Sequence, residues 1–184
     1  MIGAQVLIIA WVLTLIGVRS RILAVLLALL VLVPVHAGVS PAMALRGLWG
    51  DPSITTLQLL VLACAGRTPP ALHSGWRAPA FITLVAAALY ASALGPWNLD
   101  LYRFGYQPVA LVAAFGAIAL IAWWQGEALY VWLLAIDLIV WRTGWLESSN
   151  LWDALLDPLL MFVMAAIVLR NGYRAYQDRK TVLA

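Results

Sequence analysis

Long apolar runs, each followed by a short patch of Trp, Arg, Pro or Gly, dominate this chain of 184 residues. About 20 helical residues cross the roughly 30 Å hydrocarbon core of a bilayer. The runs approach this length, and they cover residues 2–18, 22–39, 52–66, 79–95, 108–125, 127–145 and 150–169. The pattern therefore predicts an all-α fold, a polytopic integral membrane helix bundle of about seven transmembrane helices. We expect a single transmembrane domain over residues 1–184 that ends in a short basic cytoplasmic tail, residues 170–184.

The amino-acid composition favours the same class of protein. Hydrophobic residues make up 65% of the chain and charged residues only 10%, whereas roughly a quarter of the residues in a soluble domain are charged. The formal net charge of +3 comes from arginines at predicted helix ends and from the tail, which suits orientation in a membrane better than binding to nucleic acid. Cys64 is the only cysteine. An intrachain disulfide and a multi-cysteine metal site are therefore excluded, and we interpret Cys64 as a small packing residue.

The first run has the length of a signal-peptide core but a different charge pattern. A secretory signal carries its positive charge before the apolar core, whereas Arg19 and Arg21 follow this one. We therefore expect a retained helix in the bacterial inner membrane, with the N-terminus outside and the C-terminus in the cytoplasm. This topology places Arg19, Arg21, Arg67, Arg77, Arg170, Arg174, Arg179 and Lys180 in the cytoplasm, against Arg46, Arg103 and Arg142 outside.

The third run, residues 52–66, is the weakest of the seven. A proline at its first helical position follows N-cap residues, but Thr55, Thr56 and Gln58 make its first turns polar. If this run does not cross, the topology of everything after it inverts. The arginine count favours a crossing, because the alternative places the basic tail on the wrong side.

Two further patterns predict how the helices lie. Residues 41–49 alternate apolar and polar faces over two turns, which predicts a short amphipathic helix on the outer surface. The fourth and fifth runs carry small residues at four-residue spacing, for example Ala87 with Ala91 and Ala110 with Ala114. Because small side chains let helix backbones approach closely, we expect these two helices at the centre of the bundle.

The last two runs form a predicted hairpin with the densest set of polar residues. In an antiparallel pair, residues equidistant from the tip lie at similar depth. Arg142 should therefore lie at the same depth as Asp153, which suggests a salt bridge. Asp137 should lie at the same depth as Asp157. Two carboxyl groups at that depth favour a shared proton, an arginine partner or a bound cation.

Local structure offers a simpler explanation for two of these acids. Asn150 and Asp153 have the spacing of an N-cap with an acidic partner three residues later. Asp157 precedes Pro158, and a proline within a helix frees a carbonyl and kinks the helix, so Asp157 can serve local structure. Asp137 lies between two apolar residues and has no such explanation.

A second polar set lies in the connection from Gly95 to Tyr106. Asp100 and Arg103 have i, i+3 spacing, which is typical of an ion pair on a short turn. In the alternative interpretation, the loop and its Tyr102 cover the mouth of the bundle, and Arg103 binds a lipid phosphate or a carboxylate of the last hairpin. We prefer the ion pair.

No cofactor is predicted. The chain has no G-x-S-x-G, H-E-x-x-H, Gly-rich phosphate loop or paired-cysteine motif. His36 and His73 fall on opposite sides in the predicted topology, so they cannot share a metal or a haem. His36 with Asp51 is a weak candidate for a metal site, and we interpret His36 as an interfacial hydrogen-bonding residue instead.

These observations favour a non-catalytic subunit or accessory factor of a larger membrane assembly over an enzyme. Its partners would be the lipid bilayer and another membrane protein or a second copy of the chain, and its polar cluster would bind lipid headgroups or that partner. One alternative is a proton- or cation-coupled transporter or channel that uses Asp137 and Asp157. Another is an outward-facing lipid-modifying enzyme, which requires Arg103 and the acidic residues of the loop and the hairpin to converge. No residue pattern identifies a small-molecule ligand.

Overall fold

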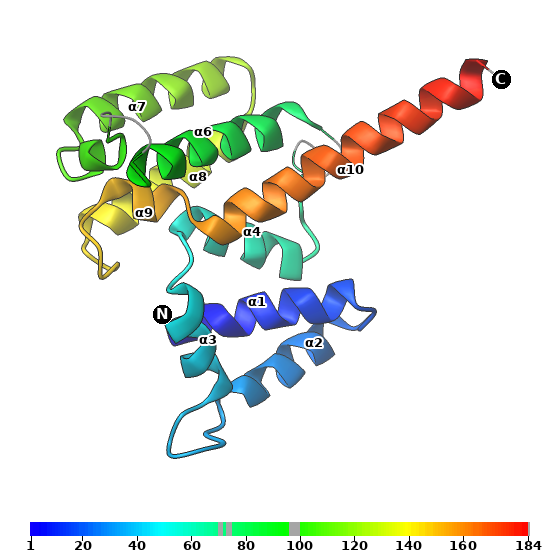
Figure 1. The fold of residues 1–184 in the computed structure, drawn as a ribbon, viewed down its shortest axis with the longest axis vertical. Helices are drawn as coiled ribbons and strands as arrows, with labels where there is room; N and C mark the ends of the chain where they lie inside the picture. Colours follow the sequence, from blue (N-terminus) through cyan, green and yellow to red (C-terminus); the bar gives the residue numbers. More distant parts are fainter. Residues whose placement is uncertain (70–71, 73–74, 96–99, 184) are drawn as a thin grey trace. The chain divides into compact units, whose positions relative to one another are not determined.

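The computed structural model describes residues 1–69, 72, 75–95 and 100–183, with side chains as far as residue 178. In these residues the regular structure is helical, apart from an isolated backbone bridge between His36 and Val39 (Figure 1). The chain divides into two compact units. Unit 1 comprises Met1–Pro52 with Thr56–Thr68, and unit 2 comprises Ser53–Thr55 with Pro69–Ala184.

The helices of the two units are short, with one exception. The first part of the chain forms α1 (Ile2–Leu15), α2 (Arg21–Ala28), the 3₁₀ turn η1 (Leu29–Leu32), α3 (Pro41–Trp49) and α4 (Ile54–Cys64). The second part forms α6 (Arg77–Ala93), the 3₁₀ turn η2 (Tyr102–Gly105), α7 (Val109–Trp124), α8 (Ala128–Arg142), α9 (Leu151–Leu155) and α10 (Pro158–Leu183). The exception is α10, with 26 residues.

Over the described ranges, no helix has both the length and the apolar character that crossing a bilayer demands. The predicted polytopic membrane bundle is therefore wrong, and so are its seven crossings, its external N-terminus, its cytoplasmic tail and its inner-membrane location. The longest helix formed by any of the first six runs is α6, with 17 residues. In α10, an apolar stretch over residues 158–169 is followed by a part that contains Arg170, Arg174 and Asp178.

Two prolines explain why apolar runs of sufficient length do not become helices of that length. The second run changes from α2 to η1 and stops at Val33, whose φ of −71° and ψ of 124° are extended. Val33 precedes Pro34, and the ring of a proline disfavours helical backbone at the residue before it. The seventh run breaks between α9 and α10, because Leu156 is extended and Pro158 opens the next helix.

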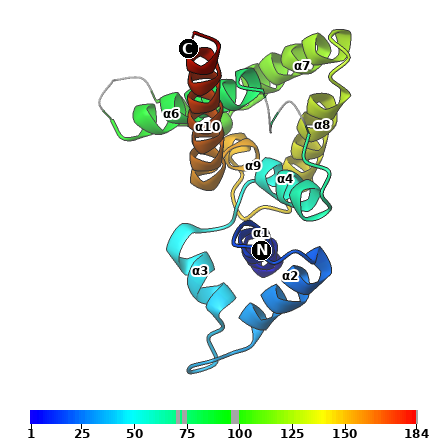
Figure 2. The ribbon, with the colours of Figure 1, turned by 90° about the vertical axis from the view of Figure 1, so that its right-hand side faces the viewer.

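Unit 1 packs around α1, which lies between α2 and α3 (Figure 2). Its core consists of Val6, Ala10 and Ala28, and the alanines let the helices approach closely. Cys64 packs against this core, as the sequence predicted, and its thiol contacts Leu7 O at 3.9 Å. Burial raises the pKa of the Cys64 thiol against the opposing effect of the Arg21 charge, so the thiol is a packing group.

The predicted helix over residues 41–49 is confirmed as α3, with the same bounds. Ser40 caps it by accepting a hydrogen bond of 3.2 Å from Met43 N, and proline occupies its first turn. The prediction that this helix lies on an outer membrane surface falls with the membrane bundle.

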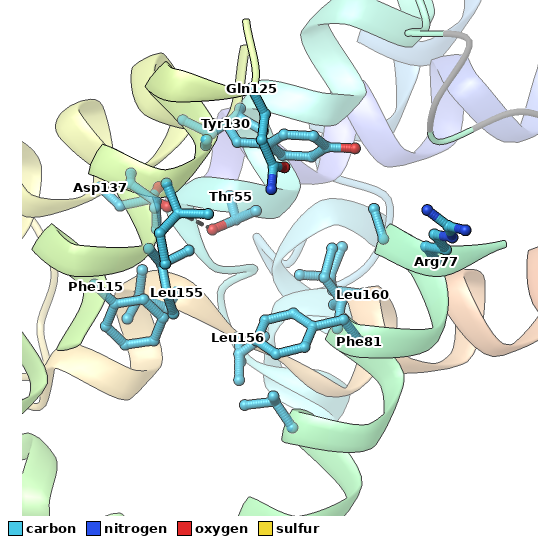
Figure 3. A pocket seen from close by; sticks show the side chains of 18 residues that line it. Thr55, Arg77, Phe81, Phe115, Gln125, Tyr130, Asp137, Leu155, Leu156 and Leu160 are labelled. Carbon is cyan, nitrogen blue, oxygen red and sulfur yellow. Dashed lines mark hydrogen bonds between the residues drawn. The ribbon is translucent and has the colours of Figure 1, made fainter. Parts of the chain in front are cut away.

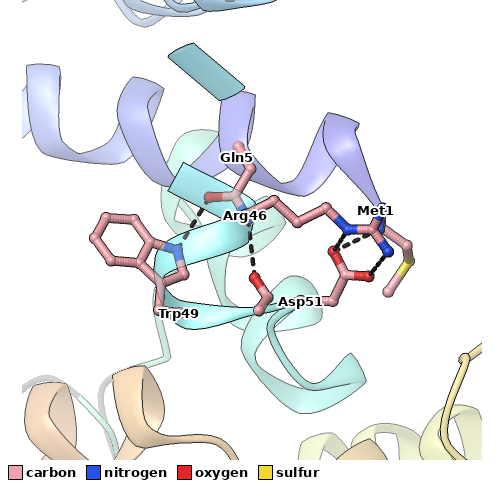
Figure 4. Close-up of polar contacts among 6 residues, drawn as sticks. Met1, Gln5, Arg46, Trp49 and Asp51 are labelled. Atoms are coloured by element: carbon pink, nitrogen blue, oxygen red, sulfur yellow. Dashed lines mark hydrogen bonds and ion pairs between the residues drawn. The ribbon is translucent and has the colours of Figure 1, made fainter. Parts of the chain in front are cut away.

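A buried polar contact joins α1 to the end of α3 (Figure 4). Gln5 has no exposed surface, donates to Gly50 O at 3.2 Å and accepts from Trp49 Nε1 at 3.1 Å. Asp51, just beyond α3, accepts from Arg46 Nε at 3.0 Å and from Nη2 at 2.9 Å, and it pairs with the Met1 ammonium group. A buried amide that is satisfied on both sides fixes how these helices meet.

Unit 2 packs in two helix pairs, α6 with α10 and α7 with α8 (Figure 1, Figure 2). The short α9 packs on α8, and η2 contacts α6, α7 and α9. The expectation that the small residues of the fourth and fifth runs place these helices at the centre of the bundle is wrong, because Ala87, Ala110 and Ala114 are all exposed. The buried residues of these two helices are Pro79, Ala86, Leu89 and Ser92 on α6 and Ala122 on α7.

A candidate ligand pocket in unit 2

Unit 2 contains a pocket of about 350 Å³, called here the unit 2 pocket (Figure 3). Its wall comes from α6, α7 and α8, from the segment around the break between α9 and α10, and from Thr55. The wall is mainly hydrophobic, and its apolar side chains include Phe81, Val85, Phe115, Leu133, Leu155 and Leu160.

Helical spacing explains why these residues face one space. On α6 the lining residues include Ala78, Phe81, Ile82 and Val85, which follow i, i+3, i+4, i+7 spacing. On α8 the same spacing relates Tyr130, Leu133, Leu134 and Asp137. Residues at these intervals share one face of an α-helix. Each helix therefore turns a single stripe toward the pocket.

Five polar residues line the unit 2 pocket, and they lie at different places around it. Asp137 is only 1% exposed and accepts a 2.7 Å hydrogen bond from Thr55 Oγ1. In Figure 3 Asp137 and Thr55 lie on one side of the pocket and Arg77 lies on the other. Gln125, at the end of α7, also lines the pocket.

The Tyr130 hydroxyl is buried and has no hydrogen-bond partner within the described part of the chain. Burial raises the pKa of this phenol, and the nearby Glu127 charge raises it further. Both effects keep the group protonated, because each disfavours a phenolate at this position. Tyr130, which is part of the pocket wall, therefore carries a neutral O–H donor.

The sequence predicted that Asp137 and Asp157 lie at one depth. In the structure they accept hydrogen bonds from the two ends of the short segment Ser53–Thr55. Asp137 accepts from Thr55, and Asp157 Oδ2 accepts from Ser53 N at 2.7 Å. Asp157 Oδ1 also accepts from Leu160 N at 2.7 Å, which caps the start of α10. Asp137 lines the unit 2 pocket and Asp157 does not. The two carboxylates thus have separate roles, and the local-structure interpretation of Asp157 describes its contacts.

The predicted salt bridge between Arg142 and Asp153 is not formed in the described structure. Asp153 accepts from the Tyr102 hydroxyl, whose oxygen lies 2.8 Å from both carboxylate oxygens. Burial, followed by this hydrogen bond, raises the pKa of Tyr102. Arg142 is exposed near the end of α8. The error arose because equal depth along a hairpin does not determine the direction in which each side chain points.

Asn150 caps α9, as predicted, and also holds the loop that contains η2. Its Oδ1 accepts from Trp152 N at 2.9 Å, and its Nδ2 donates to Tyr102 O at 3.1 Å. The Trp152 ring adds a 3.0 Å hydrogen bond from Nε1 to Leu101 O and packs edge-on against Phe115, with ring centroids 5.8 Å apart. These contacts connect the loop to the wall of the unit 2 pocket through Phe115.

Asp100 and Arg103 form a turn rather than an ion pair. Asp100 Oδ1 accepts from the Arg103 backbone N at 3.2 Å, and both residues are exposed. Tyr106 packs edge-on against Tyr102, with ring centroids 5.9 Å apart. Neither Asp100 nor Arg103 lines the unit 2 pocket. Residues 96–99 of this loop, Trp97 among them, lie outside the described residues.

The weak metal candidates are not brought together. His36 is exposed and takes part in the backbone bridge to Val39, while Asp51 pairs with Arg46 and Met1. Burial opposes the charge of Asp51, but the hydrogen bonds and charges of its two partners lower its pKa overall. In the searched ranges, no cluster of three or more His, Cys, Asp and Glu side chains is arranged to hold a metal ion. His73 lies outside the described residues.

The sequence reasoning identified Asp137 but missed Tyr130 and the hydrophobic wall. The usable signal was the spacing of Tyr130, Leu133, Leu134 and Asp137, which places an unexplained carboxyl group on the same helix face as a tyrosine. Comparison of the chain with family models, with curated proteins and with solved structures found no match. The pocket itself therefore carries the functional argument.

Proposed function

We propose that the chain is a non-catalytic binding protein whose unit 2 pocket takes a small hydrophobic molecule. The observation that carries this proposal is a pocket of about 350 Å³ with a hydrophobic wall and few polar groups. Ligand pockets in proteins are typically about 300–1,000 Å³ and have this composition. If each non-hydrogen atom takes roughly the 30 Å³ of a water molecule, the pocket holds about twelve of them.

The polar residues of the wall favour binding over catalysis. A nucleophile needs a base within hydrogen-bonding reach, and the base needs a third group to orient it. The described wall contains no His, Cys or Lys, and its Thr55 hydroxyl donates to Asp137 at 2.7 Å.

The proposal is tested with two uncharged probes of suitable size, 2-ethylnaphthalene and decan-1-ol. The purified full chain should bind at least one of them, measured by naphthalene fluorescence anisotropy and by calorimetry. Val85→Trp adds a large side chain to the pocket wall and should weaken binding at least about tenfold, because overpacking a filled space costs about 1–3 kcal/mol.

Leu84→Trp is the matched control, because Leu84 neighbours Val85 on α6 but is 69% exposed and does not line the pocket. It should bind both probes as the wild type does. The proposal fails if neither probe binds the wild type. It also fails if Val85→Trp and Leu84→Trp bind equally well.

A further inference from the structure

The buried Tyr130 hydroxyl indicates what the polar end of a ligand would be. Among the described residues, it is the buried side-chain polar atom without a hydrogen-bond partner. Such a group has lost its hydration and gained nothing in return. A ligand oxygen that accepted its proton would restore the missing hydrogen bond.

Tyr130 belongs to the pocket wall, so its O–H donor lies beside the space that a ligand would fill. The residue lies at the start of the α8 stripe that lines the unit 2 pocket. In Figure 3 the hydroxyl end of the ring points away from Asp137. Hydrophobic side chains such as Phe81 and Leu160 form the rest of the space. One molecule can therefore contact the phenol and the hydrophobic wall together.

The charges around the pocket favour an uncharged polar group. Asp137 lines the pocket, and Glu127 is close enough to influence Tyr130. These two acids oppose an anion, while Arg77, also in the wall, opposes a cation. Asp137 already accepts from Thr55, so it does not need a ligand donor. A neutral acceptor avoids both repulsions and costs less to remove from water than an ion.

We propose that the ligand is an uncharged amphiphile whose polar end is a carbonyl-type oxygen that accepts a hydrogen bond from Tyr130. Its hydrocarbon body packs on Phe81, Phe115 and Leu133. This inference rests on the proposed function and names the ligand class of the same pocket. A ketone, ester or amide on a hydrophobic body of about a dozen atoms meets these requirements.

A pair of nearly isosteric probes isolates the hydrogen bond. In 2-acetylnaphthalene a carbonyl group replaces one CH₂ of 2-ethylnaphthalene. Tyr130→Phe should weaken binding of the acetyl probe about two- to tenfold, the range expected for one hydrogen bond, and leave the ethyl probe unchanged. Tyr90→Phe is the matched control, because Tyr90 is a partly buried tyrosine of unit 2 outside the pocket wall. It should change neither affinity.

The infrared carbonyl stretch of bound 2-acetylnaphthalene provides a readout that needs no variant. In the wild type the stretch should shift to lower wavenumber than in an alkane, because a donated hydrogen bond weakens the C=O bond. An alkane-like stretch overturns the inference. So does an equal loss of affinity for both probes in Tyr130→Phe, or tighter binding of 2-naphthoate or 2-(aminomethyl)naphthalene than of the acetyl probe. These outcomes leave the proposed function intact if 2-ethylnaphthalene binds, whereas failure of every probe contradicts both proposals.

Discussion

The Thr55 hydroxyl donates a 2.7 Å hydrogen bond to the carboxylate of Asp137, which is 1% exposed, across 82 positions of sequence. Two residues earlier, Ser53 N donates to Asp157 at the same distance. A three-residue segment of unit 2, Ser53–Thr55, thus donates hydrogen bonds to two acids. Without hydrogen bonds, burial of these carboxyl groups in an apolar interior would cost free energy. The same contact holds Asp137 in the wall of the unit 2 pocket.

Thr55→Val should destabilise unit 2, because it leaves Asp137 without this donor while keeping the shape of the side chain. We expect a loss of about 1–3 kcal/mol, the usual cost of depriving a buried polar group of a hydrogen bond. Urea unfolding followed by circular dichroism measures it. Thr143→Val is the control, since the exposed Thr143 hydroxyl donates only to Val140 O at the end of α8, and it should stay within about 0.5 kcal/mol of the wild type. Equal effects of the two variants would contradict the role given to Thr55.

Asp157 should respond to substitution as an N-cap residue. Asp157→Ala removes the acceptor of Leu160 N and of Ser53 N and should cost about 2–4 kcal/mol, one cap and one charge-assisted hydrogen bond together. Asp157→Asn keeps an oxygen that can cap α10 and should cost clearly less. Hydrogen exchange of the first turn of α10 would report the difference. If Ala and Asn are equally harmful, the carboxylate charge matters more than the cap.

Lowering the pH should weaken unit 1 through Asp51. Its pKa lies below the ordinary value of 3.8 because the hydrogen bonds and charges of Met1 and Arg46 outweigh the effect of burial. A lowered folded-state pKa adds stability that is present above the unfolded pKa and is lost as the pH falls through the folded value. Asp51→Asn should therefore destabilise unit 1 at pH 7, and its deficit should shrink as the pH falls below about 4.

Hydrogen exchange of α1 and α3 amides at several pH values measures this effect. Asp100→Asn is the comparison, because Asp100 is exposed and its contact is a backbone turn that Asn can also make. A deficit of Asp51→Asn that stays constant down to pH 2 would show that the ion pairs do not carry the stability of this end of α3.

Local signals in the sequence predicted local structure well. The helix at residues 41–49, the Asn150 cap and the packing role of Cys64 each depend on neighbours within a few residues or on side-chain size. The prediction of a membrane bundle was wrong because it used the mean hydropathy of each run of residues. Hydropathy does not show where the backbone can remain helical. Val33 before Pro34 shows the limit, since the apolar character continues and the helix does not.

The candidate site was predictable only in part for a related reason. Asp137 was identified because a carboxyl group among apolar neighbours needs an explanation. Its partner Thr55 comes from a distant segment that no periodicity connects to α8. The pairing of Arg142 with Asp153 was predicted from equal depth along a hairpin. Side chains at equal depth can still point in different directions around their helix axes. In the structure, Tyr102 binds Asp153 in place of Arg142. The direction in which each helix face points depends on how the helices pack in the tertiary structure.

Two glycines of unit 2 should respond in opposite ways to the same substitution. A Cβ at Gly105 would lie 1.6 Å from Asn150 Oδ1 and 2.8 Å from the Trp152 ring, so Gly105→Ala must displace the cap of α9 and the loop that it holds. We expect a loss of more than about 1 kcal/mol, the typical value of such a cap.

Gly116 lies inside α7, and a Cβ there meets nothing within 4 Å. Gly116→Ala should raise stability by about 0.5–1 kcal/mol, because alanine loses less backbone freedom than glycine on forming a helix. Thermal and urea unfolding of the two variants checks both signs. The packing of the Asn150 cap against Gly105 is refuted if Gly105→Ala is as stable as the wild type, because a side chain cannot share the space that the Asn150 amide fills.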